Sequence, residues 1–280
     1  MFVIKFSGNV KVKRLIEINN EKKTHLCIGL DIYPELLPSY ITFKKDFVEY
    51  FIEGVIEATY EIVDAYKFNM AFFESLGSYG LKVLENVLPK IPKQIIKICD
   101  AKRGDIGSSS RMYAKGIYEH FRFDAVTLNP LLGYDSLEPF FRYINKTNYI
   151  LTLTSNPGAK EFQKLKLSNG KALFQEILDK VKTWNSKHKN LGIVFGATQK
   201  SEFKFLDKNY FDIPLLIPGV GHQGGDLNSI ISHLKKIGFK NFLINSSRDV
   251  LYLNLNGDFR KCIYNNANQL KQQINELFYS

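Results

Sequence analysis

The sequence predicts an α/β protein: a single-domain (β/α)8 TIM barrel with an extra helix near the N-terminus. Two observations lead to this fold class. Eight apolar segments of strand length alternate along the chain with segments of helical periodicity. A chain of 280 residues suits one undivided α/β barrel, and no Pro-, Gly- or Ser-rich linker interrupts it. We therefore expect residues 1–280 to form one domain.

The predicted strands are short runs of apolar and β-branched residues, as expected for parallel strands that are buried on both faces. They are residues 26–31, 65–70, 94–100, 125–129, 149–154, 192–196, 214–218 and 241–245. The predicted helices between them carry apolar residues at helical spacing. They include residues 47–63, 79–88, 111–121, 172–184 and 230–237.

Two segments lie outside this repeat, and one long irregular segment lies within it. Residues 10–19 and the amphipathic residues 266–278 are expected to form helices that cover the base of the barrel or complete its outer ring. Residues 156–171 are the longest irregular stretch and contain a turn at 168–170. This stretch is either a mobile flap or an insertion.

The composition indicates a soluble globular protein. The chain is 45% hydrophobic and 24% charged, and no apolar run approaches the roughly 18 residues that a membrane helix needs. Residues 1–12 lack the apolar core of a signal peptide, so we expect a cytoplasmic protein that does not contact membranes. Cys27, Cys99 and Cys262 are widely separated and lack metal-ligand spacing, which favours buried free thiols over disulfides or a metal site.

The charge balance raises the question of nucleic-acid binding. The formal net charge is +10 and the sequence pI is near 9.3. The excess is almost all lysine, dispersed along the chain without the pattern of an RNP motif, a zinc finger or a helix-turn-helix. Dispersed lysine is typical of a solvated surface, so we expect no nucleic-acid partner. An anionic small substrate is compatible with this charge.

The most informative motif is DAKRGDIG, residues 100–107. It places Asp100, Lys102 and Asp105 at D-x-K-x-x-D spacing directly after an apolar run. At a surface strand end these residues would be solvated charges. In an interior, an unpaired charge costs several kcal/mol, so the acids and the lysine would have to compensate one another. The mostly apolar segment that precedes the motif, IIKIC at residues 95–99, favours the interior position with compensating charges.

Other polar residues occur at the ends of the predicted strands as well. In a (β/α)8 barrel the carboxyl ends of all strands meet at one face, and active sites lie there. Unrelated surface charges would instead be scattered over both ends of the barrel. The residues that gather at this face are Asp31, Lys67, Asp100, Lys102, Ser155 and Arg248.

A glycine-rich segment, PGVGHQGGD, follows the seventh predicted strand. Residues 218–226 carry glycine at four of nine positions, and glycine lets backbone N–H groups approach an anion closely. The loops after the seventh and eighth strands form the usual phosphate site of such barrels. Gln223 can add a side-chain amide and Arg248 a bidentate guanidinium. The segment therefore predicts a phosphate-binding site.

Six motifs, taken in order and spacing across residues 27–248, resemble the orotidine 5'-phosphate decarboxylase family. They are LCIGLD, YKFN, DAKRGDIG, LTSNPG, PGVGHQGGD and NSSR. DAKRGDIG and the segment LNPLLGYDSLEPF, residues 128–140, are similar to a divergent branch of that family that is common in bacteria. The D-x-K-x-x-D spacing alone is shared with sugar-phosphate relatives, whereas the ordered set is specific.

The resemblance implies decarboxylation of orotidine 5'-phosphate to UMP and CO2 without a cofactor or metal, the last step of UMP biosynthesis. It also implies a homodimer with shared active sites, in which Lys67, Asp100 and Lys102 form a charged array with Asp105 from the partner subunit. Lys102 would lie against C6 of the pyrimidine, as counter-charge and general acid for a carbanion. Adjacent carboxylates would keep Lys102 protonated despite burial.

The resemblance implies substrate contacts too. Asp31 and Lys67 would hold ribose hydroxyls and Ser155 the pyrimidine, while Gln223 and Arg248 would bind the phosphate. The remaining substrate-binding residues would be Pro218, Gly219 and Ser247, with Ile106 and Ser109 from the partner subunit.

Three positions depart from the family's commoner form. Ser109 stands where threonine is frequent, and His222 fills a variable position in the phosphate loop. Ser247 stands where many members have glycine, although the serine doublet recurs in the divergent branch.

Two other functions remain open from sequence. A metal-dependent sugar-phosphate decarboxylase or aldolase of the same fold would need an acidic ligand after the second strand, where this chain has Lys67, and a cation repels a divalent metal. A non-catalytic barrel could instead bind RNA through its basic surface. Salt-sensitive RNA binding without turnover would indicate that class.

Overall fold

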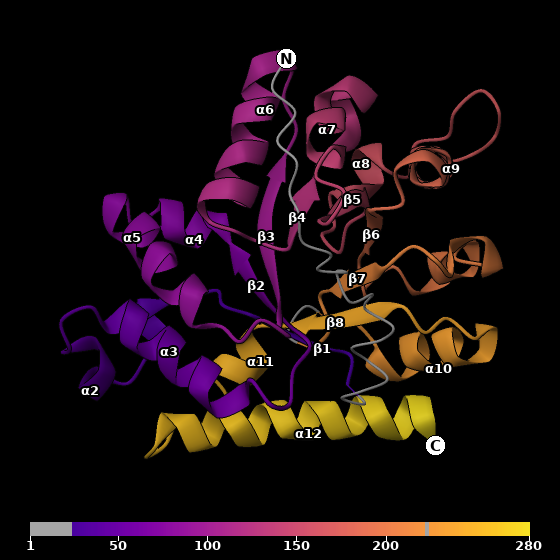
Figure 1. Ribbon diagram of the computed structural model, residues 1–280. Helices are drawn as coiled ribbons and strands as arrows, with labels where there is room; N and C mark the ends of the chain where they lie inside the picture. The colour runs from indigo at the N-terminus through magenta and orange to yellow at the C-terminus, as the bar shows by residue number, and fades with distance from the viewer. Residues whose placement is uncertain (1–23, 222–223) are drawn as a thin grey trace.

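The computed structural model describes residues 24–221 and 224–280. Eight parallel strands close into one barrel in sequence order, and β8 pairs with β1 (Figure 1). The strands are β1 (Leu26–Gly29), β2 (Ala65–Asn69), β3 (Ile96–Arg103), β4 (Ala125–Leu128), β5 (Thr147–Leu153), β6 (Leu191–Phe195), β7 (Leu215–Pro218) and β8 (Phe242–Ser246). The predicted barrel is confirmed.

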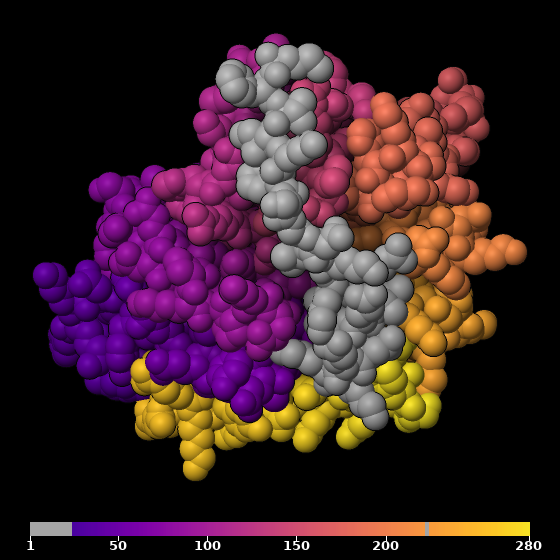
Figure 2. Space-filling view, viewed as in Figure 1, coloured from indigo at the N-terminus to yellow at the C-terminus, as the bar shows by residue number. Residues whose placement is uncertain are grey.

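Helices cover the outside of the barrel (Figure 1). They are α2 (Ser39–Thr42), α3 (Phe47–Thr59), α4 (Met70–Glu74), α5 (Ser78–Val87), α6 (Gly107–Lys115), α7 (Tyr134–Phe141), α8 (Ala159–Phe162), α9 (Leu173–His188), α10 (Leu227–Ile237), α11 (Arg248–Leu251) and α12 (Phe259–Tyr279). The last helix, α12, contacts α3, α10 and β1 and so closes the ring of helices. In Figure 2 its yellow surface forms the lower edge of the molecule, beside the indigo surface of α2 and α3.

The apolar core has two layers, one inside the barrel and one between the barrel and its helices. The inner layer takes one side chain from each strand: Cys27, Ala65, Ile98, Ala125, Tyr149, Val194, Leu216 and Leu243. Tyr149 fits inside because Gly192 on β6 has no side chain, and a Cβ there would lie 2.5 Å from the tyrosine ring. Strands buried on both faces account for the continuous apolar runs in the sequence.

Two element boundaries matter for the site. β3 runs to Arg103 rather than ending at Asp100 as predicted, so Lys102 lies in the strand itself and not in the following loop. The sequence reasoning missed α7, which follows β4. This helix contains Pro139, a residue that normally ends helices.

The predicted strict alternation of strands and α-helices is wrong between β6 and β7. That connection contains the 3₁₀ segments Lys200–Phe205 and Lys208–Tyr210. Its aromatic residues replace a helix face, since Phe203 packs edge-on against Phe195 of β6. The last helix was predicted from residue 266 but begins at Phe259.

The predicted helix at residues 10–19 lies outside the described residues. Cys27 and Cys99 are buried free thiols as predicted, whereas the free thiol Cys262 on α12 is partly exposed. Among the described residues, no helix is both long enough and apolar enough to cross a membrane.

Candidate active site

A cavity of about 500 Å³ lies at the carboxyl end of the strands. Most of the predicted site residues line it: Asp31, Lys67, Asp100, Lys102, Ser155, Pro218, Gly219, Ser247 and Arg248. Sequence reasoning missed several further lining residues: Tyr33, Asn69, Phe72, Thr127, Thr154, Asn156 and Gln163. Asn69 and Asn156 stand within the motifs YKFN and LTSNPG, so their position was the signal that could have found them.

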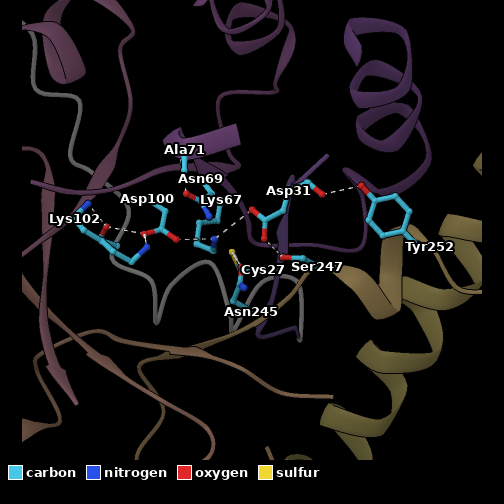
Figure 3. A network of polar contacts seen from close by, with 11 residues as sticks. Cys27, Asp31, Lys67, Asn69, Ala71, Asp100, Lys102, Asn245, Ser247 and Tyr252 are labelled. Atoms are coloured by element: carbon cyan, nitrogen blue, oxygen red, sulfur yellow. Dashed lines mark hydrogen bonds and ion pairs between the residues drawn. The ribbon is translucent and has the colours of Figure 1, made fainter. Parts of the chain in front are cut away.

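Four charged side chains of alternating sign lie in a row along the cavity wall: Lys102, Asp100, Lys67 and Asp31 (Figure 3). Lys102 Nζ lies 2.7 Å from Asp100 Oδ1. Lys67 Nζ lies 2.8 Å from Asp100 Oδ2 and 3.8 Å from Asp31 Oδ1. Lys67 is only 4% exposed, whereas the side chain of Lys102 is 49% exposed. The row therefore ends in a cation that a ligand can reach.

The buried members of this array are charged because they neutralise one another. Burial alone would lower the pKa of Lys67, but Asp100 and Asp31 outweigh burial and hold that pKa above its usual value. Burial alone would raise the pKa of Asp100, yet Lys67 and Lys102 hold it well below its usual range. At neutral pH the array therefore contains a buried ammonium and a buried carboxylate.

β3 becomes irregular where the array begins. Cys99 of β3 pairs with Val126 of β4, and the next pair is Arg103 with Leu128. Between these two pairs β3 advances by four residues and β4 by only two, which makes a bulge in β3. Within this bulge Lys102 has a φ of 48°, a left-handed conformation that is unusual for a long side chain. From this backbone the ammonium of Lys102 reaches the Asp100 carboxylate.

Asp31, which follows β1, is held from two sides (Figure 3). The Ser247 hydroxyl donates to Asp31 Oδ2 at 2.8 Å, and the Tyr252 hydroxyl donates to the Asp31 backbone oxygen at 2.8 Å. Gly29 makes room for this contact, because a Cβ there would lie 2.0 Å from Ser247 Oγ. Asp31 Oδ1 is buried and accepts no hydrogen bond from the described residues. It can therefore accept one from a ligand hydroxyl.

The predicted phosphate site lies after β7 and β8. Pro218, Gly219 and Arg248 line the cavity, and Arg248 is the first residue of α11. Gly219 has a φ of 91°, which favours glycine, and its carbonyl accepts a hydrogen bond from the Gly225 N–H at 3.1 Å. This hydrogen bond joins Gly219 to Gly225 at the cavity wall that Arg248 also lines. His222 and Gln223 lie outside the described residues.

The segment after β5 also belongs to the cavity wall. Gln163 Oε1 accepts a hydrogen bond from the Thr154 N–H at 2.8 Å, and the Thr198 hydroxyl donates to the Ser155 carbonyl at 2.7 Å. These bonds tie the backbone around Ser155 to α8 and to the turn after β6. Because Asn156 and Gln163 line the cavity, part of the irregular segment at 156–171 contributes to the site.

Asp105, Ile106 and Ser109 do not line this cavity. They lie at the start of α6, where Ile106 is 63% exposed and its N–H donates to Asp105 Oδ1 at 2.7 Å. Other large apolar side chains are exposed on α6 and in the connection from β4 to α7. They are Met112, Tyr113, Leu131 and Leu132.

The chain is similar to known proteins in both sequence and fold. The model of the Orotidine 5'-phosphate decarboxylase / HUMPS family matches residues 24–251. The chain belongs to this family. A protein named orotidine 5'-phosphate decarboxylase from Dehalococcoides mccartyi (strain CBDB1) is 40% identical, over 94% of this chain and 97% of the relative. One of the same name from Herpetosiphon aurantiacus is 44% identical, over 82% and 85%. The structure of Leishmania donovani OMP decarboxylase has a TM-score of 0.78 at 29% identity, covering 95% of this chain and 99% of that one.

The motifs that resemble the orotidine 5'-phosphate decarboxylase family converge on one cavity in this fold. LCIGLD, YKFN and DAKRGDIG supply the charged array, LTSNPG supplies the wall after β5, and PGVGHQGGD and NSSR supply the predicted phosphate site. Segments up to about 220 residues apart in sequence thus meet at one face, as expected for the active-site end of a barrel. The resemblance seen in the sequence is confirmed.

Proposed function

We propose that this chain is a cytoplasmic, single-domain orotidine 5'-phosphate decarboxylase that forms UMP and CO2 without a metal or other cofactor, the last step of UMP biosynthesis. The observation that carries the proposal is the alternating array of Lys102, Asp100, Lys67 and Asp31 in a cavity that also contains Arg248. The array offers an accessible ammonium, and the arginine offers an anion site. Orotidine 5'-phosphate needs both.

Lys102 would carry the chemical step. Loss of CO2 breaks the bond between C6 and the carboxylate and leaves an electron pair in an sp² orbital that the ring cannot delocalise. The Lys102 ammonium stabilises this pair as a preorganised counter-charge and then donates a proton to C6. The products are UMP and CO2, and solvent reprotonates the lysine amine.

The remaining charges of the array orient Lys102 and the ribose. Asp100 pairs with Lys102 and stays ionised, so the counter-charges need no rearrangement when the carbanion forms. Asp31 and Lys67 hold the ribose hydroxyls, since Asp31 Oδ1 accepts no hydrogen bond from the described residues. Ser247 supports this contact through its hydrogen bond to Asp31. Ser155 binds the pyrimidine.

Phosphate binding would supply energy for orientation. Pro218, Gly219, Gln223 and Arg248 hold the phosphate, far along the substrate from C6. Such remote binding energy fixes the reacting atoms and excludes water from them.

A metal-dependent sugar-phosphate reaction is the nearest alternative. Lys67 Nζ lies between the Asp31 and Asp100 carboxylates, at 3.8 and 2.8 Å, where a divalent cation would need the same oxygen atoms. The test is to add orotidine 5'-phosphate to the purified protein in excess chelator and to follow UMP formation. We expect full turnover. Activity that chelation abolishes and a divalent metal restores would contradict the proposal.

The active unit would be a homodimer with shared sites that binds neither nucleic acid nor membrane. In support, Asp105, Ile106 and Ser109 lie outside the cavity of their own subunit, among exposed apolar side chains on α6 and near α7. An exposed apolar patch of this kind typically marks a protein interface. Across that interface Asp105 would add a second carboxylate beside Lys102.

Mixed dimers test the shared site. Lys102→Ala and Asp105→Ala subunits are each expected to be inactive alone. In a mixed dimer one site carries both defects and the other carries neither, so random pairing of equal amounts restores roughly one quarter of wild-type activity. A mixture that stays inactive, or a fully active monomer in a sedimentation-coupled assay, would contradict shared sites.

A further inference from the structure

Thr127, on β4, has a buried hydroxyl to which neither the sequence motifs nor the proposed chemistry assigns a role. Thr127 is 2% exposed and lines the cavity. Its hydroxyl donates to Asp100 Oδ1 at 2.9 Å and accepts a hydrogen bond from the Lys102 backbone N–H at 3.0 Å. One side chain thus contacts both the carboxylate and the backbone of the lysine that it pairs with.

We infer that Thr127 is a positioning residue that fixes the direction of the Asp100 carboxylate and of the Lys102 ammonium together. A threonine hydroxyl has a single hydrogen to donate, and Thr127 gives it to Asp100. The hydroxyl therefore has no hydrogen left to donate to the substrate, and its hydrogen bonds connect it to these two charged residues. The inference rests on the proposed function, because it takes Lys102 as the reacting group.

The hydrogen bonds around Asp100 explain why a third donor matters. Asp100 Oδ2 accepts from Lys67 Nζ at 2.8 Å, and Oδ1 accepts from Lys102 Nζ at 2.7 Å. Both donors end long side chains, and that of Lys102 is half exposed. Thr127 adds a short, β-branched donor with restricted χ1 on a third strand. Donors from β2, β3 and β4 together fix the plane of the carboxylate.

The backbone contact explains how Lys102 keeps its unusual conformation. Regular pairing of β3 with β4 is interrupted between Cys99 and Arg103, so Lys102 lies in the unpaired stretch. The Thr127 hydroxyl takes the place of a strand partner for the Lys102 N–H. Beyond it, the Asn129 N–H donates to the Arg103 carbonyl at 2.8 Å and closes the bulge. The hydroxyl thereby stabilises the left-handed residue from which the ammonium projects.

Substitution of Thr127 separates positioning from packing. Thr127→Val keeps the shape of the side chain and removes the hydroxyl. We expect kcat for orotidine 5'-phosphate to fall about tenfold to a hundredfold. KM and the Kd of UMP should stay within about threefold, because no phosphate or ribose contact is lost. Thr127→Ser keeps the hydroxyl and should restore kcat to within about threefold of wild type.

Thr152→Val is the matched control. Thr152 is a fully buried barrel threonine on β5 whose hydroxyl donates to the Val194 carbonyl at 2.6 Å, and it does not line the cavity. The Thr152→Val variant should have a melting temperature lowered about as much as that of Thr127→Val, but an unchanged kcat. If Thr127→Val does not fold, Thr127→Ala and Thr127→Ser, which differ by one oxygen atom, replace it.

The inference is overturned if Thr127→Val keeps wild-type kcat, if Thr127→Ser is as impaired as Thr127→Val, or if Thr152→Val loses as much kcat. Failure of both the Val and Ala variants to fold, with a folded Ser variant, would assign the hydroxyl to barrel stability and also overturn it. Absence of UMP formation by the wild-type protein would instead remove the proposed function, a distinct result.

Discussion

The two ends of the barrel treat buried titratable side chains in opposite ways. At the carboxyl end, Lys67 keeps its charge because Asp31 and Asp100 lie on either side of it. At the amino end, burial lowers the pKa of His25 to about 4, although its hydrogen bond to the Phe242 carbonyl acts in the opposite direction. The presence of counter-charges, more than depth, decides whether a buried group keeps its charge.

The geometry around His25 suits a neutral ring. Its Nδ1 lies 3.0 Å from the Phe242 carbonyl oxygen, which can only accept, so Nδ1 carries the proton. Its Nε2 then accepts from the Tyr279 hydroxyl at 3.0 Å, and the ring stacks on Phe242 with centroids 3.9 Å apart. The amino end thus uses a neutral histidine to attach α12, whereas the carboxyl end keeps charges for chemistry.

Lys102→Ala should have the largest effect on activity. It removes both the counter-charge and the general acid, so we expect kcat to fall by about 10⁴-fold or more. The melting temperature should change little, because the Lys102 side chain is half exposed and Asp100 keeps Lys67 and Thr127 as partners. Steady-state kinetics and thermal unfolding measure the two effects. Residual kcat above a hundredth of wild type would remove Lys102 from the chemical step.

Arg248→Ala should have the next largest effect on activity, since Arg248 also lies at the carboxyl end of the barrel. We expect kcat to fall as well as KM to rise, with kcat/KM lower by about 10²- to 10³-fold, because phosphate binding orients C6 at Lys102. Arg142→Ala is the matched control, since Arg142 is an exposed arginine that pairs with Glu138. A raised KM with unchanged kcat would show that phosphate contributes only to binding.

As the pH falls, the protein should first lose the stability that the neutral His25 contributes at the amino end of the barrel. As the pH falls from about 6.5 to about 4, the unfolded chain binds a proton at His25 that the folded chain does not, so up to about 3 kcal/mol of stability is lost. The array behaves differently: the pKa of Asp100 is lowered on folding, so its contribution is present above about pH 4 and is lost only in stronger acid.

Urea unfolding at several pH values measures this difference. His25→Phe keeps an aromatic ring but cannot titrate, so its stability should vary less with pH between about 6.5 and 4 than that of wild type. Equal dependence in wild type and His25→Phe would contradict the neutral histidine. Activity of His25→Phe at pH 7 should match wild type.

Much of the site at the carboxyl end of the barrel could be predicted from sequence, because its charged residues directly follow apolar segments. A charged residue after a continuous apolar run is costly unless it is paired, which is why Asp31 and Asp100 were found. Thr127 could not be found this way, since a threonine in the strand AVTL resembles any other β-branched residue. Its role depends on the shifted pairing of β3 with β4, a property of two strands rather than of one.

Other residues depend on features that a single sequence does not express. α7 was missed because Pro139 interrupts its pattern, yet proline is tolerated there. Gln163 belongs to the site only because the segment after β5 folds back, so that its amide reaches Thr154. The proposed role of Asp105 needs a second subunit, and one chain cannot show that contact.

The central claim is that Lys102 lies against C6 when the nucleotide is bound. A crystal structure of the protein with UMP measures this directly. We expect Lys102 Nζ roughly 3 to 3.5 Å from C6, with Asp100 still paired to it. A bound nucleotide with its phosphate at Arg248 and the Lys102 ammonium turned away from C6 would contradict the account.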